Sequence, residues 1–147
     1  MKKRILALDL GARRIGVAVS DPLGITAQGL DTIQRGNGRS DMETLQRLAR
    51  QYEVGMVLVG QPLNMNGTSG TQAQKAEFFA GQLQKRLGID VKLWDERLTT
   101  AEAQRVLKLS GVSLEKRKAA IDRMSAVILL QSYLDRVPEA ESEVESK

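Results

Sequence analysis

The pattern of apolar and polar positions predicts a chain that begins with strands and then alternates strands with helices. Apolar runs at 5–8 and 15–19 flank a tight turn, and a further strand is expected at 27–33. Short apolar runs at 56–60 and 91–94 predict two more strands. The first two runs form a predicted β-hairpin in the middle of the sheet, because both of their faces are apolar.

Helical spacing fills the intervals between and after these strands. A helix capped by Ser40 or Asp41 is expected to extend to about residue 52, and the clearest period, at 76–87, ends at Gly88. Thr99 with Glu102 has the spacing of a capping box and predicts another helix. Residues 110–118 are expected to form a basic connector, followed by a last helix over 119–136 that is apolar almost all round from 124 to 134 and therefore buried.

This order predicts an α/β domain in which the later strands run parallel to their sheet neighbours through right-handed crossovers. If the first strand joins that parallel set, then Asp9, Gln61 and Glu96 all follow carboxyl ends of strands. Ligands bind at that edge of open α/β sheets.

Composition narrows the chemistry that such a site can use. The 147 residues suit one domain, expected at 1–137, with an acidic, disordered tail at 138–147. The sequence contains neither cysteine nor histidine. Disulfides, thiolate zinc sites, cysteine nucleophiles and imidazole bases are therefore excluded, and chemistry must depend on carboxylates, lysine, hydroxyls or a cation held by oxygen atoms.

The charge of the chain favours a polyanionic partner, although only weakly. The formal charge is +4, and the tail carries −3 of its own, which leaves +7 for the domain. Asp9 interrupts the apolar run after the basic start of the chain, so neither a signal peptide nor a membrane helix is expected. A cytoplasmic location fits these features.

Three carboxylates occupy positions where an acid is costly. Asp9 ends a buried strand, Glu96 follows another, and Asp122 lies near the start of the apolar last helix. Each has a structural explanation when taken alone, since Asp9 could open a turn, Glu96 could pair with Arg97, and Asp122 could complement the helix N-terminus or pair with Arg123. Together at one edge they would form an oxygen-lined site for Mg²⁺ or Mn²⁺.

A site of this kind is suited to phosphodiester hydrolysis, in which two metal ions activate a water and stabilise the leaving oxygen. Basic side chains near the predicted edge could then hold backbone phosphates: Arg13, Arg14, Arg97, Lys116, Arg117 and Lys118. The polar loop at 61–71 offers backbone amides, amide side chains and hydroxyls for the same task, from Asn64, Asn66, Gly67 and Thr68. An ordinary surface connection is the alternative interpretation of that loop.

The sequence closely resembles the YqgF/RuvX family of nucleases, which are related to Holliday junction resolvases. Four blocks carry the resemblance and span nearly the whole chain: LALDLGARRIGVAVSD at 6–21, VGQPLNMNGT at 59–68, KLWDERLTTAEA at 92–103 and IDRMSAVILLQSYL at 121–134. The DERLTT block and the Asn-Met-x-Gly loop are specific, whereas the first block alone is not.

The resemblance implies an RNase H-like fold with a five-stranded mixed sheet whose first three strands are antiparallel, flanked by helices. It implies catalytic, metal-binding acids at Asp9, Glu96 and Asp122, and adds Thr99 and Thr100 to the expected substrate-binding residues. The implied activity is a metal-dependent endonuclease that matures the precursor of 16S ribosomal RNA, working on precursor particles as a monomer or homodimer. This chain has Asn66 and Ser69 where relatives often have acids, so its loop is less acidic than theirs.

Other functions remain open from the sequence. Branched DNA is the second candidate substrate. An ATP-binding fold of the actin and sugar-kinase type also opens with an Asp-x-Gly hairpin, but it needs a second domain for which this chain is too short. A non-catalytic RNA-binding module fits the basic charge equally well, and only the predicted convergence of three acids opposes it.

Overall fold

The computed structural model describes residues 3–97, 111 and 113–136, and it describes side chains in the last helix from 124 onward. The predicted acidic tail and the helix predicted after Thr99 lie outside this range.

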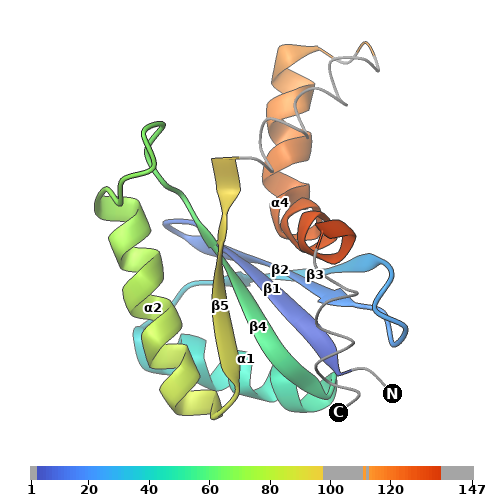
Figure 1. Ribbon diagram of the computed structural model, residues 1–147, viewed down its shortest axis with the longest axis vertical. Helices are drawn as coiled ribbons and strands as arrows, with labels where there is room; N and C mark the ends of the chain where they lie inside the picture. The colour runs from blue at the N-terminus through green and yellow to red at the C-terminus, as the bar shows by residue number, and fades with distance from the viewer. Residues whose placement is uncertain (1–2, 98–110, 112, 137–147) are drawn as a thin grey trace.

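The five predicted strands are present and form one mixed sheet (Figure 1). The strands lie in the order β3-β2-β1-β4-β5, with β1 antiparallel to β2, β2 antiparallel to β3, and β1, β4 and β5 parallel. The carboxyl ends of the three parallel strands therefore meet at one edge, as predicted. The strands are β1 (Arg4–Leu10), β2 (Arg14–Ser20), β3 (Ala27–Gln34), β4 (Val54–Gln61) and β5 (Asp90–Asp95).

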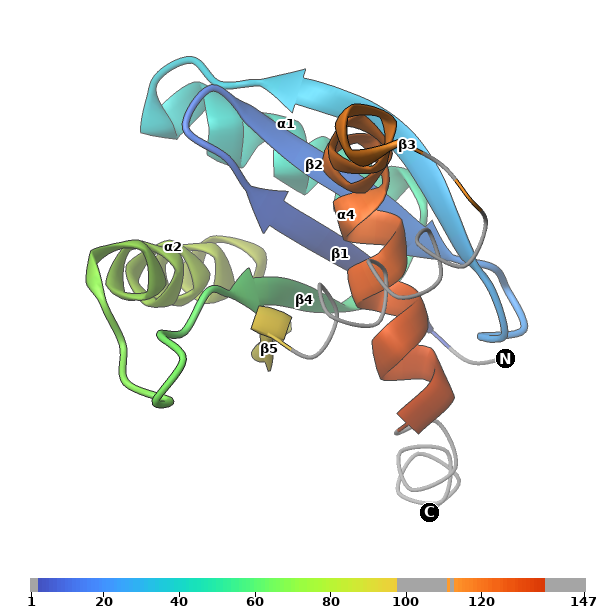
Figure 2. The same ribbon diagram turned by 90° about the horizontal axis from the view of Figure 1, so that it is seen from above.

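Helices cover both faces of the sheet (Figure 2). On one face α1 (Gly38–Gln51) and α2 (Thr71–Leu87) enclose the larger aliphatic cluster, which includes Leu6 and Leu8 of β1. On the other face α4 (Leu114–Arg136) packs on a cluster that includes Ala7. Because successive residues of a strand point to opposite faces, Asp9 lies on the same face as Ala7, under α4.

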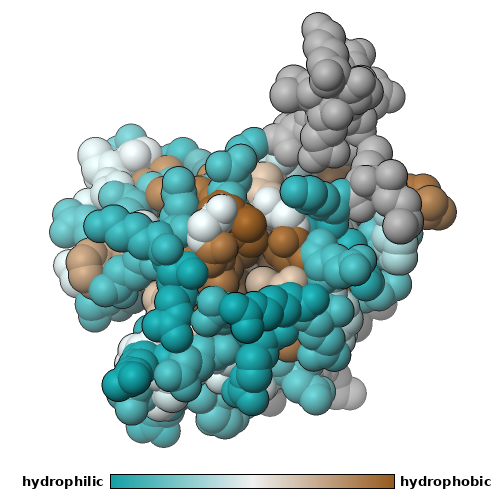
Figure 3. Space-filling view, turned by 90° about the horizontal axis from the view of Figure 1, so that it is seen from below, coloured by the Kyte–Doolittle hydropathy of each residue, from teal (hydrophilic) through white to brown (hydrophobic). Residues whose placement is uncertain are grey.

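The central strands are buried because both of these layers are apolar. Leu6, Ala7 and Leu8 are fully buried, as are Val57, Leu58 and Val59 of β4. Partly buried hydrophobic residues surround the larger cluster, and the view from below shows apolar residues at the centre of that side, framed by hydrophilic ones (Figure 3).

Two predicted helix starts are wrong. The cap of α1 is Asn37, whose side chain accepts a hydrogen bond from the Ser40 backbone amide, while Asp41 is buried and accepts from Gly36. The last helix begins at Leu114 rather than Ala119. Residues 114–118 of the predicted connector at 110–118 are thus helical, because lysine and arginine are good helix formers whose charge gives no reason to end a helix.

Two other local predictions are confirmed. Gly88 ends α2 in the left-handed conformation, with φ of 69°. The last helix is buried at most of its apolar positions, although Met124 is 46% exposed. Within the described part of the chain, no helix combines the length and hydropathy that crossing a bilayer requires.

Candidate active site

Asp9 lies at the carboxyl end of β1, on the face that α4 covers. It pairs across the hairpin with Gly16 of β2. A methyl group at Gly16 would lie 3.6 Å from the Asp9 Cβ and 3.6 Å from the Ala126 Cβ of α4. Asp9, Gly16 and Ala126 therefore meet at one point, where small residues let α4 approach the sheet closely.

Glu96 follows β5 directly and reaches back over β4. Any Cβ at Gly60 of β4 would overlap the Glu96 carboxylate, so this carboxylate occupies the space that a side chain would otherwise fill. The strand register places Gly60 beside Trp94 of β5, and the Leu8–Val59 pairing puts it level with Asp9 of β1. The glycine thus opens a path by which Glu96 crosses one strand to reach Asp9.

The two carboxyl groups interact directly. The pKa of Glu96 is raised to about 8, first by burial and then by the hydrogen bond with Asp9 and the negative charges of Asp9 and Asp95. At neutral pH Glu96 therefore keeps a proton that it shares with Asp9. A pair of this kind has oxygen ligands for a divalent cation, which would replace the proton and relieve the repulsion between the two charges.

Asp122 lies in α4 at a position whose side chain is outside the described residues. The backbone places it one helical turn before Ala126, which packs beside Asp9. Further along α4, the Tyr133 hydroxyl lies 3.8 Å from the Met56 sulfur near the start of β4, so the helix runs antiparallel to β1 and β4. Going back from Ala126 to Asp122 leads toward the carboxyl edge of the sheet. The described side chains alone supply no group of three potential metal ligands.

Asp95 has a different partner from its neighbour Glu96. Its carboxylate accepts hydrogen bonds from the Arg97 backbone amide at 2.9 Å and from Arg97 Nη2 at 2.7 Å, and the latter bond is also an ion pair. These interactions hold the pKa of Asp95 below its ordinary value. Arg97 thus pairs with Asp95, and the predicted alternative of a Glu96–Arg97 pair is wrong.

Arg97 also holds the loop that follows β4. Its Nη1 donates to the Met65 carbonyl at 3.1 Å and lies 3.7 Å from the position that a Cβ on Gly67 would take. Gly67 has φ of 86°, a conformation that favours glycine. Arg97 therefore connects the end of β5 to this loop, and a phosphate contact by the same side chain stays a prediction.

The predicted substrate-binding loop is ordered by its own hydrogen bonds. The Thr68 hydroxyl donates to the Asn66 side-chain oxygen at 2.6 Å, and the Asn64 amide nitrogen donates to the Thr68 hydroxyl at 3.0 Å. The loop projects beyond the carboxyl edge of the sheet, with Met65 at its tip 92% exposed (Figure 1). Its four predicted residues lie together on the side of the molecule where the acid pair is found.

The remaining predicted contacts divide into two groups. Arg13 and Arg14 are exposed in the β1–β2 turn, directly after the strand that carries Asp9. The turn is closed by a 2.9 Å bond from the Gly11 amide to the Arg14 carbonyl. Thr99 and Thr100 lie outside the described residues, as do the side chains of Lys116, Arg117 and Lys118.

Sequence reasoning missed two features at the carboxyl edge of the sheet. Gly60 is essential to the position of Glu96, and the only sign of this role in the sequence is that a glycine ends an apolar strand. Glu77 of α2 accepts hydrogen bonds from Gln61 at 2.9 Å and from Ser69 at 2.8 Å, which lower its pKa. It looked like an ordinary polar position on an amphipathic helix, yet it fixes both ends of the loop.

Comparison with known proteins identifies the family. The family model described as "RuvX: Holliday junction resolvase" matches residues 3–136. The chain belongs to the RuvX family. Among its relatives, a protein of Koribacter versatilis is 51% identical over 133 residues, covering 90% of this chain and 87% of the relative. A Thermoanaerobacter pseudethanolicus relative is also 51% identical, with 90% and 96% coverage. Both bear the name "Putative pre-16S rRNA nuclease".

Solved structures similar to this RuvX chain establish the fold. Thermus thermophilus RuvC in complex with a Holliday junction substrate aligns with a TM-score of 0.57 at 12% identity, covering 93% of this chain and 97% of that one. A second structure of RuvC from this organism aligns with a TM-score of 0.53. The RuvX chain thus has the RNase H-like fold that the sequence resemblance implied.

Proposed function

We propose that this RuvX protein is a divalent-metal-dependent endonuclease that hydrolyses phosphodiester bonds in the processing of the 5′ end of pre-16S ribosomal RNA. The observation that carries the proposal is the Asp9–Glu96 pair, in which the carboxyl group of β1 and the one directly after β5 meet over Gly60 at the carboxyl edge of the sheet. The names of the relatives supply the substrate.

In this proposal Asp9, Glu96 and Asp122 hold Mg²⁺ or Mn²⁺. A bound ion would lower the pKa of its water and stabilise the leaving oxygen, which is chemistry that a chain without histidine needs from a metal. Asp9 and Glu96 contribute the oxygen ligands, and Gly60 leaves the space in which they meet. Asp122 would be the ligand from α4, the helix that packs on the same face of the sheet as Asp9.

The surrounding residues would bind and orient the substrate. Arg13 and Arg14 provide positive charge beside Asp9, and the loop ordered by Asn64, Asn66 and Thr68 presents amides and hydroxyls to the sugar–phosphate backbone. Thr99, Thr100 and the basic residues at 116–118 complete the predicted contacts. Because the substrate is a ribosomal precursor, we place the protein in the cytoplasm, acting on precursor particles as a monomer or a homodimer.

Branched DNA is the second candidate substrate. The family description names a Holliday junction resolvase, and the fold matches that of RuvC. A shared fold does not determine the substrate, so this candidate has less support than ribosomal RNA. A purely RNA-binding role is opposed by the acid pair, which would repel phosphate unless a cation intervened.

Side-by-side cleavage assays test the proposal. The purified protein is incubated with pre-16S RNA and with four-way-junction DNA, each with Mg²⁺, with Mn²⁺ or with EDTA. We expect cleavage of the RNA near its 5′ end with either ion and none with EDTA. Preferential cleavage of the junction would favour the second candidate, and equal cleavage in EDTA would refute the metal-dependent mechanism.

A further inference from the structure

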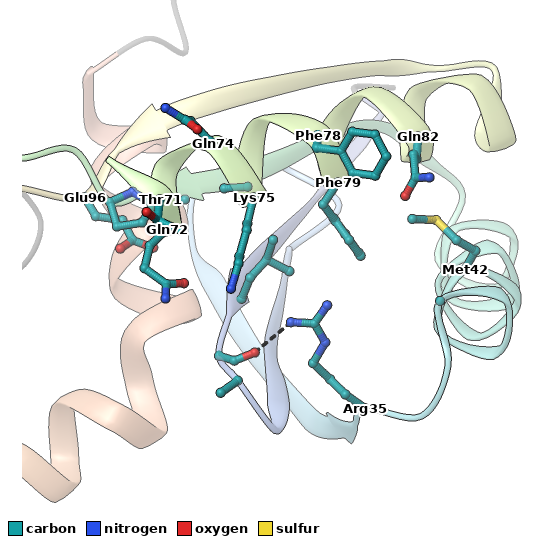
Figure 4. Close-up of a pocket in the computed structure, with 17 residues that line it drawn as sticks. Arg35, Met42, Thr71, Gln72, Gln74, Lys75, Phe78, Phe79, Gln82 and Glu96 are labelled. Carbon is teal, nitrogen blue, oxygen red and sulfur yellow. Dashed lines mark hydrogen bonds between the residues drawn. The ribbon is translucent and has the colours of Figure 1, made fainter. Parts of the chain in front are cut away.

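A groove leads away from Glu96 between α2 and the β1–β2 turn. Its volume is about 540 Å³, and Glu96 and Gly60 line one end of it. Figure 4 shows Glu96 beside Thr71 and Gln72 at this end, Lys75 in the middle, and Gln82 with Met42 of α1 at the other end. The groove therefore starts at Glu96 of the proposed reaction centre and follows one face of α2.

Three of the residues that α2 contributes to the groove form a row along the helix. Lys75, Phe78 and Gln82 are spaced by three and four residues, so they lie on one face, with Phe78 about 4.5 Å further along the axis than Lys75. Phe78 is 69% exposed, although its neighbour Phe79 is buried. An aromatic ring borders the groove without being needed in the core.

Lys75 presents a positive charge to the groove. In the described part of the molecule it makes no hydrogen bond or ion pair, and it extends from α2 into the groove (Figure 4). Arg35 on the opposite wall is held in place, because its Nη1 donates to the Gly11 carbonyl at 2.8 Å and its Nε lies 3.7 Å from Asp41. Among the described residues that line the groove, Lys75 is thus the cation whose charge remains available to a ligand.

We propose that this groove binds an unpaired nucleic-acid strand that flanks the scissile phosphate, with a phosphate on Lys75 and a base stacked on Phe78. Proteins that bind single strands without sequence preference combine positive charge along the backbone with aromatic rings on which bases stack. The volume lies within the roughly 300–1,000 Å³ of small-ligand pockets and is too small to enclose a double helix. The proposal extends the proposed function, because it assigns the enzyme substrates that are single-stranded beside the cleavage site.

Binding of labelled oligonucleotides in EDTA tests the groove without requiring cleavage. Fluorescence anisotropy gives the affinity for an unpaired RNA and for its duplex as a function of salt. We expect the wild type to prefer the unpaired strand and Phe78→Ala to weaken its binding about 5- to 150-fold, while Phe78→Trp retains it. Lys75→Ala should reduce the magnitude of the slope of log affinity against log salt by about 0.7.

Matched variants control for lost apolar surface and lost charge. Leu23 is also 69% exposed but is remote from the groove lining, and Lys85 is an exposed lysine of α2 outside the groove. Leu23→Ala and Lys85→Ala should bind as the wild type does, and thermal melting should show all variants folded. Normal binding by Phe78→Ala, equal weakening by Leu23→Ala, or a preference for the duplex would each overturn the groove proposal.

The outcome of the binding test can be distinguished from the outcome of the cleavage assay. If Phe78→Ala binds normally while the wild type cleaves precursor RNA in Mg²⁺, the groove proposal fails and the proposed function stands. If Phe78→Ala weakens binding but the wild type cleaves nothing, the groove is a strand-binding site and the proposed nuclease function fails.

Discussion

Asp95 and Glu96 are adjacent in the sequence, yet their carboxyl groups have opposite environments. Asp95 is neutralised by Arg97, which lowers its pKa, whereas Glu96 is buried beside Asp9 and its pKa rises to about 8. The first carboxylate fastens a loop to the sheet with partners from the protein itself. Glu96 has no cationic partner among the described residues. The comparison therefore indicates that Glu96, and not Asp95, is the acid available to bind an external cation.

Removing the acid pair should have the largest effect. We expect Asp9→Asn and Glu96→Gln each to reduce Mg²⁺-dependent cleavage by roughly 10³-fold, because each removes an oxygen ligand of the proposed metal site. The melting temperature should hold or rise, since the folded state no longer bears the cost of a buried acid whose pKa is raised. Initial rates on precursor RNA measure the loss, and undiminished cleavage by Asp9→Asn would remove Asp9 from the mechanism.

Displacing Glu96 without altering any carboxyl group should have the next largest effect. In Gly60→Ala the new methyl group would overlap the Glu96 carboxylate and push it away from Asp9. We expect cleavage to fall about 10²-fold, since misplacement by about 1 Å can have that cost. Gly81→Ala is the control, because a Cβ there meets nothing within 4 Å. Its activity should be normal, and equal rates for the two variants would refute the role of Gly60.

Breaking the ion pair between Asp95 and Arg97 should have a milder effect on activity. Arg97→Ala removes the side-chain bonds to Asp95 and to the loop carbonyls. We expect a roughly tenfold fall in cleavage, mainly through a higher KM, from the loss of about 1–2 kcal/mol of loop positioning. Hydrogen exchange should rise at 62–70 and stay unchanged in β1. Unchanged exchange in the loop would show that Arg97 does not fix it.

The smallest expected effect is on the pH dependence of stability, which should differ between Asp95 and Glu96. The pKa of Glu96 is raised in the folded state, so folding retains a proton that the unfolded chain loses above its ordinary pKa of 4.5. The contribution of Glu96 to the free energy of unfolding is therefore complete below pH 4.5 and is lost as the pH rises to about 8.

We expect the melting temperature of Glu96→Gln to exceed that of the wild type by roughly 5 °C at pH 8, with the difference vanishing near pH 4. Calorimetry across this range measures the difference. Asp95→Asn should show the opposite trend, because the lowered pKa of Asp95 stabilises the folded state above pH 4. Parallel curves for wild type and Glu96→Gln would contradict the shared proton.

Much of this arrangement could be predicted from the sequence. Apolar runs located all five strands, and the crossover rule brought Asp9 and Glu96 to one edge. Helix starts were less predictable, because Asn37 and Asp41 are both suitable caps and only tertiary burial of Asp41 decides between them. The contact between Arg97 and Asp95 was missed because adjacent charges admit several pairings, and only the loop carbonyls favour this one.

Other parts of the site depend on distances that no local pattern encodes. The role of Gly60 follows from the register between β4 and β5, which places its missing side chain under Glu96. The groove along α2 forms between elements that are far apart in the sequence, so the row of Lys75 and Phe78 looked like the solvent face of an amphipathic helix. Substrate-binding roles and the ligand role of Asp122 stay predictions.

The central claim is that Asp9, Glu96 and Asp122 hold a divalent cation, and crystals grown with Mn²⁺ test it most directly. Anomalous scattering locates the manganese independently of the protein atoms. The account predicts a peak at the carboxyl edge of the sheet, within coordination distance of the carboxylates of all three residues, and its loss in Glu96→Gln crystals. A well-ordered site without manganese, or manganese bound elsewhere on the chain, would contradict it.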